Sequence, residues 1–321
     1  MAAVRGLINV MATAHPQATC AADPIPAKVP DAAAPNVTRG ILYMIAATVA
    51  FAITHALSKW LVADYPVGQV MFSRSIVGFA ICAAVLLPMF GPSVFATSRP
   101  GAHWMRGLSQ SLSQTFSVLA FSMMPLAGAV AINFSAPLWA ALVAIIWLKE
   151  RAGPARWTAL LTGFAGVLVV TNPGIDILTL GAIFALLNAI MLGTVTVAVR
   201  GMTRTESVNT LLIWQLATVS IFHALLLPFG LKWPTPFDLS LFAMCGIANL
   251  IGQVFWTRAL MLAPATAVSP FFYFLLVWSA AIGFVVWDEV PTMALLIGSS
   301  VVVASGLFLL WHEAQAKKSG S

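Results

Sequence analysis

Residues 107–150 read GLSQSLSQTFSVLAFSMMPLAGAVAINFSAPLWAALVAIIWLKE, and residues 246–289 read GIANLIGQVFWTRALMLAPATAVSPFFYFLLVWSAAIGFVVWDE. The second stretch follows the first at a constant offset of 139 positions without a gap. Eight of the 44 aligned positions are identical: Gly107/Gly246, Gln114/Gln253, Phe116/Phe255, Ala120/Ala259, Pro125/Pro264, Trp139/Trp278, Ala141/Ala280 and Glu150/Glu289. Because several of these residue types are uncommon in an apolar chain, the pattern indicates two copies of one structural unit.

The composition of the chain indicates that its solvent is a lipid bilayer. Of 321 residues 60% are apolar and 8% are charged, and the mean hydropathy is +0.94, so the charges are too few to cover a water-soluble globule. A membrane-spanning helix needs roughly 20 mostly apolar residues. Ten such segments are predicted, at residues 39–62, 67–88, 103–124, 127–149, 154–171, 177–199, 207–229, 237–262, 265–287 and 291–311.

The placement of basic residues predicts the orientation of these segments. If the N-terminus is cytoplasmic, 13 of the 16 Lys and Arg residues fall at inner ends and loops. Lys59 and Lys232 fall outside and Arg74 falls within a span, so the distribution follows the positive-inside rule. The net charge of +6 therefore reflects membrane topology and does not indicate nucleic-acid binding.

The repeat and the span count together predict the architecture. Five spans per copy is an odd number, so the second copy must enter the membrane from the opposite side. We predict an all-α integral membrane protein of ten transmembrane helices in two inverted five-helix repeats, a design that suits alternating access to a midplane site. The expected regions are a disordered cytoplasmic tail (1–36), the first repeat (37–175), the second repeat (176–313) and a short cytoplasmic tail (314–321).

A family resemblance extends over about residues 39–311. The motifs that carry it are Arg106-Gly107, Pro125-Leu126-Ala127, Pro137-Leu138-Trp139, Leu148-Lys149-Glu150 and Gly163-Phe164-Ala165-Gly166-Val167. They resemble the drug/metabolite transporter superfamily, EamA type, which implies a ten-helix carrier in the bacterial inner membrane with both termini cytoplasmic. The segments Lys59-Trp60-Leu61, Tyr65-Pro66 and Phe72-Ser73-Arg74 are similar to the subgroup of riboflavin and S-adenosylmethionine importers. Where that subgroup usually has Asp four residues before the Lys, this chain has His55, so a carboxylate proton carrier is not implied.

Three basic residues form the first part of the predicted substrate site. Arg74 lies roughly 12 Å along a helix from Pro66, at a depth where a charge is costly and usually functional. His55 and Lys59 are four residues apart and therefore share a helix face. With no Asp or Glu in the interior of any predicted span, these residues are expected to form a cationic cluster that awaits carbonyl groups, water or an anionic substrate. Alternatively, Lys59 extends to the outer interface and Arg74 ties helix ends together.

Polar and aromatic residues of the repeated segments form the second part of the predicted site. One amide per helical turn is expected to line a cavity on both copies, and two aromatic rings are expected to stack on a planar ligand. The residues are Gln110, Gln114, Asn249, Gln253, Trp256 and Tyr273. The alternative roles are hydrogen bonding between helices, at about 0.6 kcal/mol each, and packing or interface contacts for the aromatic rings.

Three further residues are expected to have structural or gating roles. Pro137 cannot donate to the carbonyl of residue 133, so a kink is predicted there. Glu150 and Glu289 end the fourth and ninth predicted spans. They are expected to bond free N–H groups of the next helix, whose first turn contains Pro154 or Pro291.

These features predict the function. The chain has no catalytic motif, no ATP-binding phosphate loop and no cysteine pattern for metal or disulfides, so no catalytic residue, metal or cofactor is expected. We predict a secondary active transporter of a small organic metabolite with a planar or anionic part, whose partners are its substrate and the bilayer. An exporter of amino acids or drugs is the alternative, and a membrane enzyme or channel a more distant one. The sequence leaves open import or export, proton coupling or counter-substrate exchange, and monomer or homodimer.

Overall fold

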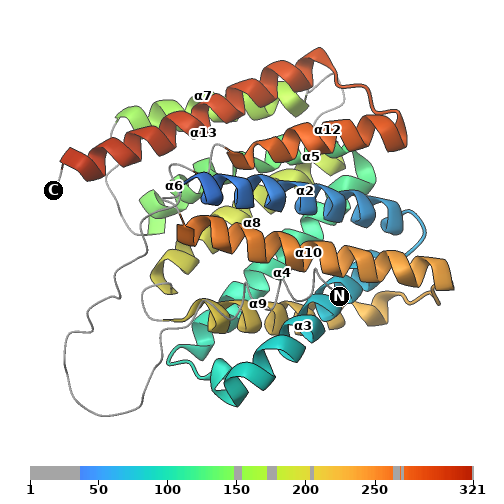
Figure 1. Cartoon of the computed structure of the whole chain (residues 1–321). Helices are drawn as coiled ribbons and strands as arrows, with labels where there is room; N and C mark the ends of the chain where they lie inside the picture. Colours follow the sequence, from blue (N-terminus) through green and yellow to red (C-terminus); the bar gives the residue numbers. More distant parts are fainter. Residues whose placement is uncertain are drawn as a thin grey trace, which may run out of the picture.

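The structure is a computed structural model that describes residues 37–147, 154–171, 179–202, 206–262, 268 and 271–319. These residues are mainly helical and contain no β-strand (Figure 1). In chain order the elements are α2 (Val37–Val62), α3 (Val67–Phe90), η1 (Gly91–Phe95), α4 (Pro100–Met123), α5 (Leu126–Asn133), α6 (Ala136–Trp147), α7 (Pro154–Thr171), α8 (Leu180–Met202), α9 (Val208–Ala224), η2 (Leu227–Phe229), α10 (Pro236–Leu262), α12 (Phe274–Trp287) and α13 (Met293–Ser319).

Proline marks the start of several helices. Proline has no N–H and a fixed φ, so it suits the first turn of a helix, where that N–H would lack a partner. The residues concerned are Pro66 before α3, Pro100 at the start of α4, Pro125 before α5, Pro154 at the start of α7 and Pro236 at the start of α10. These prolines of the sequence therefore mark helix starts in the structure.

The helices are apolar enough for a membrane, as the all-α membrane fold class requires. By length and composition, four segments can cross a bilayer: Thr38–Val62, Val67–Phe95, Asn209–Phe229 and Pro236–Ala259. Shorter apolar helices include Leu161–Val170, Leu180–Val195, Phe274–Trp287 and Met293–Phe308. The fold class is thus confirmed, whereas the count of ten spans remains a prediction.

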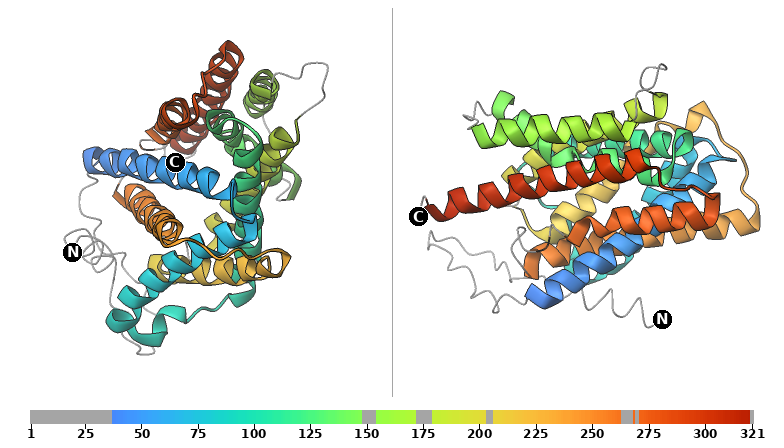
Figure 2. Two further views of the ribbon diagram at one scale, coloured as in Figure 1. Left: turned by 90° about the vertical axis from the view of Figure 1, so that its right-hand side faces the viewer. Right: turned by 90° about the horizontal axis from the view of Figure 1, so that it is seen from above.

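Helices from the two halves of the chain pack in pairs. α2 lies beside α10, and α8 lies beside α4. In the repeat, α2 corresponds to α8 and α10 corresponds to α4, so the two contacts are equivalent. α3 lies beside α9 at one edge of the bundle and α7 beside α13 at the opposite edge, and each pair joins corresponding helices of the two copies (Figures 1 and 2). The pairing therefore has the pattern of a two-fold relation between the copies.

Gly107 and Gly246, which begin the repeated segments, occupy equivalent close contacts. A Cβ atom at Gly107 would lie 2.5 Å from the Cβ of Thr218 on α9. A Cβ atom at Gly246 would lie 2.6 Å from the Cβ of Val77 on α3. Both distances are shorter than van der Waals contact, so helix packing explains why both copies have glycine at this position.

The fourth predicted span is broken, which confirms the expected kink. α5 ends at Asn133, and α6 begins at Ala136 with Pro137 as its second residue. In the second copy α12 begins at Phe274, directly after Tyr273, which occupies the position equivalent to Phe134. Discontinuous helices at equivalent positions of two repeats are typical of transporters.

Some sequence predictions differ from the structure or cannot be compared with it. Helix α13 continues to Ser319, beyond the predicted end at residue 311 and into the segment expected to be a tail, because residues 312–319 contain no Gly or Pro. Helix α8 is shifted by three residues from the predicted span 177–199. The predicted disordered tail (1–36), the repeat boundary near residue 175 and Glu150 lie outside the described residues.

Candidate substrate site

Arg74 connects three helices, α3, α2 and α4. Its side chain extends from α3 and the residue is only 5% exposed. Nη2 donates a hydrogen bond of 2.6 Å to Oε1 of Gln114 on α4, and Nη1 donates one of 3.4 Å to Oγ of Ser58 on α2. Two residues of the predicted site, Arg74 and Gln114, are therefore in direct contact.

Two buried nitrogen atoms beside this contact have no protein partner. In the described part of the chain, neither Nε of Arg74 nor Nδ1 of His55 makes a hydrogen bond. His55 is on α2, and its ring lies against Phe121 of α4 at a centroid distance of 4.9 Å. Because buried polar groups are normally satisfied, these two atoms are available to a ligand with hydrogen-bonding groups.

The charge of Arg74 has no carboxylate partner among the residues that the structure describes. Within the described ranges, no Asp or Glu lies within ion-pair distance of its guanidinium group. A buried, unpaired cation is unfavourable unless polar groups or an anion compensate it. The arrangement can therefore bind an anionic or electron-rich group beside an aromatic ring.

A buried histidine on α9 contacts the residue that follows Arg74. His223 is fully buried, and its Nδ1 lies 3.2 Å from Oγ of Ser75, the residue after Arg74. Its Nε2 lies 3.4 Å from the carbonyl oxygen of Ser111, which can only accept, so this nitrogen donates. The contact with Ser75 brings α9 to the candidate site.

Lys59 has a partner that the sequence analysis did not predict. Its Nζ forms an ion pair with Oε1 of Glu289 and donates a hydrogen bond of 3.1 Å to the carbonyl oxygen of Met124. The expected unpaired cationic cluster is thus wrong for Lys59. Glu289 lies outside the interior of every predicted span, 230 positions away in sequence, so the search for acidic residues within spans missed it.

Glu289 also binds a different helix from the one predicted. Its Oε2 accepts a hydrogen bond of 2.8 Å from the backbone N–H of Leu126, the first residue of α5. The prediction that Glu289 serves the helix after Pro291 is therefore corrected. The N–H groups at the start of α5 are equally unsatisfied by their own helix, and the turn at Asp288 directs the carboxylate toward them.

The other predicted site residues are not bonded to Arg74. Gln110 and Gln253 are half-buried, Asn249 is buried, and Trp256 is 37% exposed, so the predicted site residues of α10 do not all face inward. Tyr273 packs against Phe134. The substrate-binding role of these residues remains a prediction. Among the predicted polar and aromatic site residues, Gln114 is the one that bonds to Arg74 in the described part of the chain.

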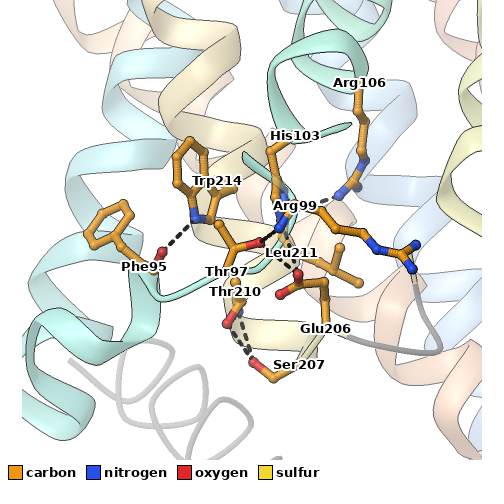
Figure 3. A network of polar contacts seen from close by, with 10 residues as sticks. All are labelled: Phe95, Thr97, Arg99, His103, Arg106, Glu206, Ser207, Thr210, Leu211 and Trp214. Carbon is orange, nitrogen blue, oxygen red and sulfur yellow. Dashed lines mark hydrogen bonds and ion pairs between the residues drawn. The ribbon is translucent and has the colours of Figure 1, made fainter. Parts of the chain in front are cut away.

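A second buried polar network lies at the other end of α4 (Figure 3). Arg106 donates to the carbonyl oxygen of Leu211 at 3.2 Å, as Figure 3 shows. It also donates to Oε1 of Gln215 at 2.5 Å, and both acceptors are on α9. His103 stacks on Trp214, and its Nε2 is 4.0 Å from Oε1 of Glu206. Arg106 is one of the basic residues predicted at the inner ends of spans, and the structure shows it buried between helices.

Taken with the repeated helices, a buried polar site at the junction of several helices defines a membrane carrier. The chain belongs to the EamA-like transporter family, whose model matches it twice, at residues 38–172 and 179–311. The protein is accordingly a multi-pass membrane transporter and not an enzyme. The two matches correspond to the two copies seen in the sequence.

Individual relatives are distant but cover most of the chain. The chain is 27% identical to a riboflavin transporter of Rhizobium johnstonii over 87% of its own length and 93% of the relative. It is 25% identical to an S-adenosylmethionine uptake transporter of Rickettsia bellii (86% and 95% covered) and 27% identical to a pseudopaline exporter of Pseudomonas aeruginosa (84% and 95%). A crystal structure with a TM-score of 0.59 and 21% identity covers 85% of this chain and 96% of its own, and it supports the fold alone.

Proposed function

We propose that the protein is a secondary active transporter that binds a small organic metabolite at Arg74 and moves it across the bacterial inner membrane. The observation that carries this proposal is the buried guanidinium group with no acidic partner in the described residues. Its Nε and the neighbouring Nδ1 of His55 both lack a hydrogen bond there. Such a site in a transporter is stabilised when a substrate supplies the missing acceptor.

The surroundings of Arg74 favour a substrate with a planar or anionic part. Gln114 and Ser58 hold the terminal nitrogen atoms of Arg74, so the guanidinium plane is fixed. The rings of Phe121 and His55 offer aromatic surface beside it. Riboflavin-like, S-adenosylmethionine-like and amino-acid-like compounds share these features, and the first two classes match what two of the relatives carry.

The mechanism we propose is alternating access by two inverted repeats, residues 37–175 and 176–313. The exchange-symmetric pairing of α2 with α10 and of α8 with α4 supports this arrangement. Arg74 contacts α2 and α4 of the first repeat, while α10 of the second repeat packs closely on the Arg74 backbone through Gly246. A rocking movement between the repeats would therefore change access to Arg74 from each side.

Export of amino acids or drugs is the second candidate, because one relative of similar identity is a pseudopaline exporter. We also propose that both termini are cytoplasmic. Coupling by a proton or by a counter-substrate, and assembly as a monomer or a homodimer, are the alternatives within this proposal. A pH gradient and a preloaded substrate, applied separately to proteoliposomes, distinguish proton coupling from exchange.

A binding screen followed by a transport assay tests the proposal. Purified protein in detergent is heated with flavins, S-adenosylmethionine and amino acids, since a ligand at 100 times its dissociation constant adds about 2.7 kcal/mol to stability. A stabilising compound is then tested for saturable counterflow into proteoliposomes. A compound that binds the wild-type protein but shows no counterflow would contradict transport of that compound. Unchanged binding of the compound to Arg74→Gln would contradict the proposed site.

A further inference from the structure

One carboxylate joins the two halves of the chain at the end of the bundle where α2 and α12 terminate (Figure 1). Oε1 of Glu289 pairs with Nζ of Lys59, and Oε2 accepts from the backbone N–H of Leu126 at 2.8 Å. The same Nζ donates to the carbonyl oxygen of Met124 at 3.1 Å. The end of α12 is thus fastened to α2 and to the turn between α4 and α5.

The backbone around Glu289 directs its side chain to this position. Asp288 adopts a left-handed conformation with φ of 54°, which reverses the chain after α12. The N–H of Glu289 then donates to the carbonyl oxygen of Gly283 at 3.1 Å. A Cβ atom at Gly283 would lie 2.7 Å from Oε2 of Glu289, so a glycine here leaves room for the carboxylate.

The surroundings of the ion pair limit its contact with solvent. The side chains of Lys59 and Glu289 are 12% and 16% exposed. The ring of Trp287 covers the ammonium group, with Nζ 5.1 Å from the ring centroid. Partial burial strengthens the attraction between the charges compared with a pair on an open surface.

We infer that Glu289 and Lys59 form a latch that closes this end of the transport path. The inference rests on the proposed alternating access. Lys59 directly follows Ser58, which contacts Arg74, so the latch lies next to the candidate substrate site. Separating α2 from α12 and α5 requires the ion pair and the bond to Leu126 to break. Access to Arg74 from this end therefore depends on release of Glu289.

A cysteine on α5, near the bond between Glu289 and Leu126, reports opening of the latch. Ala129 is 2% exposed and lies on α5, one turn after Leu126. The reporter Ala129→Cys is made in a protein with Cys20→Ser, Cys82→Ser and Cys245→Ser. Its reaction with the membrane-impermeant reagent sulfonatoethyl methanethiosulfonate is expected to be at least about tenfold faster with Glu289→Gln or Lys59→Gln, because local opening exposes the thiol.

Two controls separate latch opening from other effects. Asp288→Asn removes a neighbouring charge and keeps a residue that tolerates the left-handed conformation, so the labelling rate should stay at the parent value. Ala47→Cys replaces a fully buried residue on α2, three turns from Lys59 toward the opposite end, and should remain unreactive in every variant.

The possible outcomes either support or overturn the latch. Faster labelling at residue 129 alone, in both latch variants, supports it. Unchanged labelling in both variants, equal acceleration by Asp288→Asn, or acceleration at residue 47 as well would overturn it. Because labelling needs no substrate, this result is independent of whether Arg74→Gln abolishes transport, which tests the proposed function.

Discussion

The ring of Phe134 meets the ring of Tyr273 edge to face, with a centroid distance of 4.9 Å and an interplanar angle of 77°. The two residues are 139 positions apart, which is the offset of the repeat, and each lies at the turn before a helix, α6 or α12. The breaks of the two corresponding helices are therefore in direct contact, as expected for residues near a two-fold axis between the copies.

The contact of Phe134 with Tyr273 should be energetically coupled. Phe134→Leu and Tyr273→Leu each remove one ring, and a double-mutant cycle of unfolding free energies should give a coupling of about 0.5–1.5 kcal/mol. Tyr273→Phe retains the ring and serves as the control, with little loss of coupling. Additive single effects would show that the two breaks are independent.

Glycine at the two equivalent helix contacts should be required for stability. Gly107→Ala and Gly246→Ala would place a methyl group against Thr218 and Val77, and overpacking of this kind costs about 1–3 kcal/mol. Gly101→Ala on α4 is a matched control, because nothing lies within 4 Å of the added carbon. Thermal unfolding in detergent measures all three, and equal melting temperatures would contradict the close packing of these helices.

The sequence was sufficient for the repeat, most helix boundaries and the break before Pro137, because proline, glycine and hydropathy act locally. It also placed Arg74 and Gln114 in the interior, since polar groups within apolar segments are costly wherever the helices lie. It did not identify the partner of Lys59 or the role of His223. Those contacts join residues 230 and 148 positions apart, and only the packing of α2 against α12 and of α3 against α9 brings them together.

The second buried arginine should contribute to stability through α9. Gln215→Leu removes an acceptor and leaves the guanidinium group of Arg106 with a buried donor unsatisfied, which costs about 1–3 kcal/mol. Adding Arg106→Met to Gln215→Leu should recover part of this loss, because the buried charge is then gone. Unfolding free energies of the single and double variants provide the measurement. Strictly additive losses would argue against the contact between Arg106 and Gln215.

The proposed orientation predicts which loops face each side of the membrane. Ser93 lies in η1 between α3 and α4, and Trp233, which is 89% exposed, lies between α9 and α10. Single cysteines at these positions, in a protein lacking Cys20, Cys82 and Cys245, should react with an impermeant reagent from opposite sides, with residue 233 outside. Labelling of both from one side would contradict the inverted topology.

The central claim is that Arg74 binds the substrate, and a comparison of the two buried arginines tests it most directly. The measurement is the dissociation constant of the most stabilising compound from the screen, determined on folded, purified Arg74→Gln, Arg74→Lys and Arg106→Gln variants. Loss of a charged hydrogen-bond donor to a ligand costs about 1.5–3 kcal/mol, so Arg74→Gln should bind at least about tenfold more weakly than wild type. Arg74→Lys should fall between them, because it retains the charge without the planar group. Arg106→Gln should bind like wild type, whereas unchanged affinity in Arg74→Gln would contradict the account.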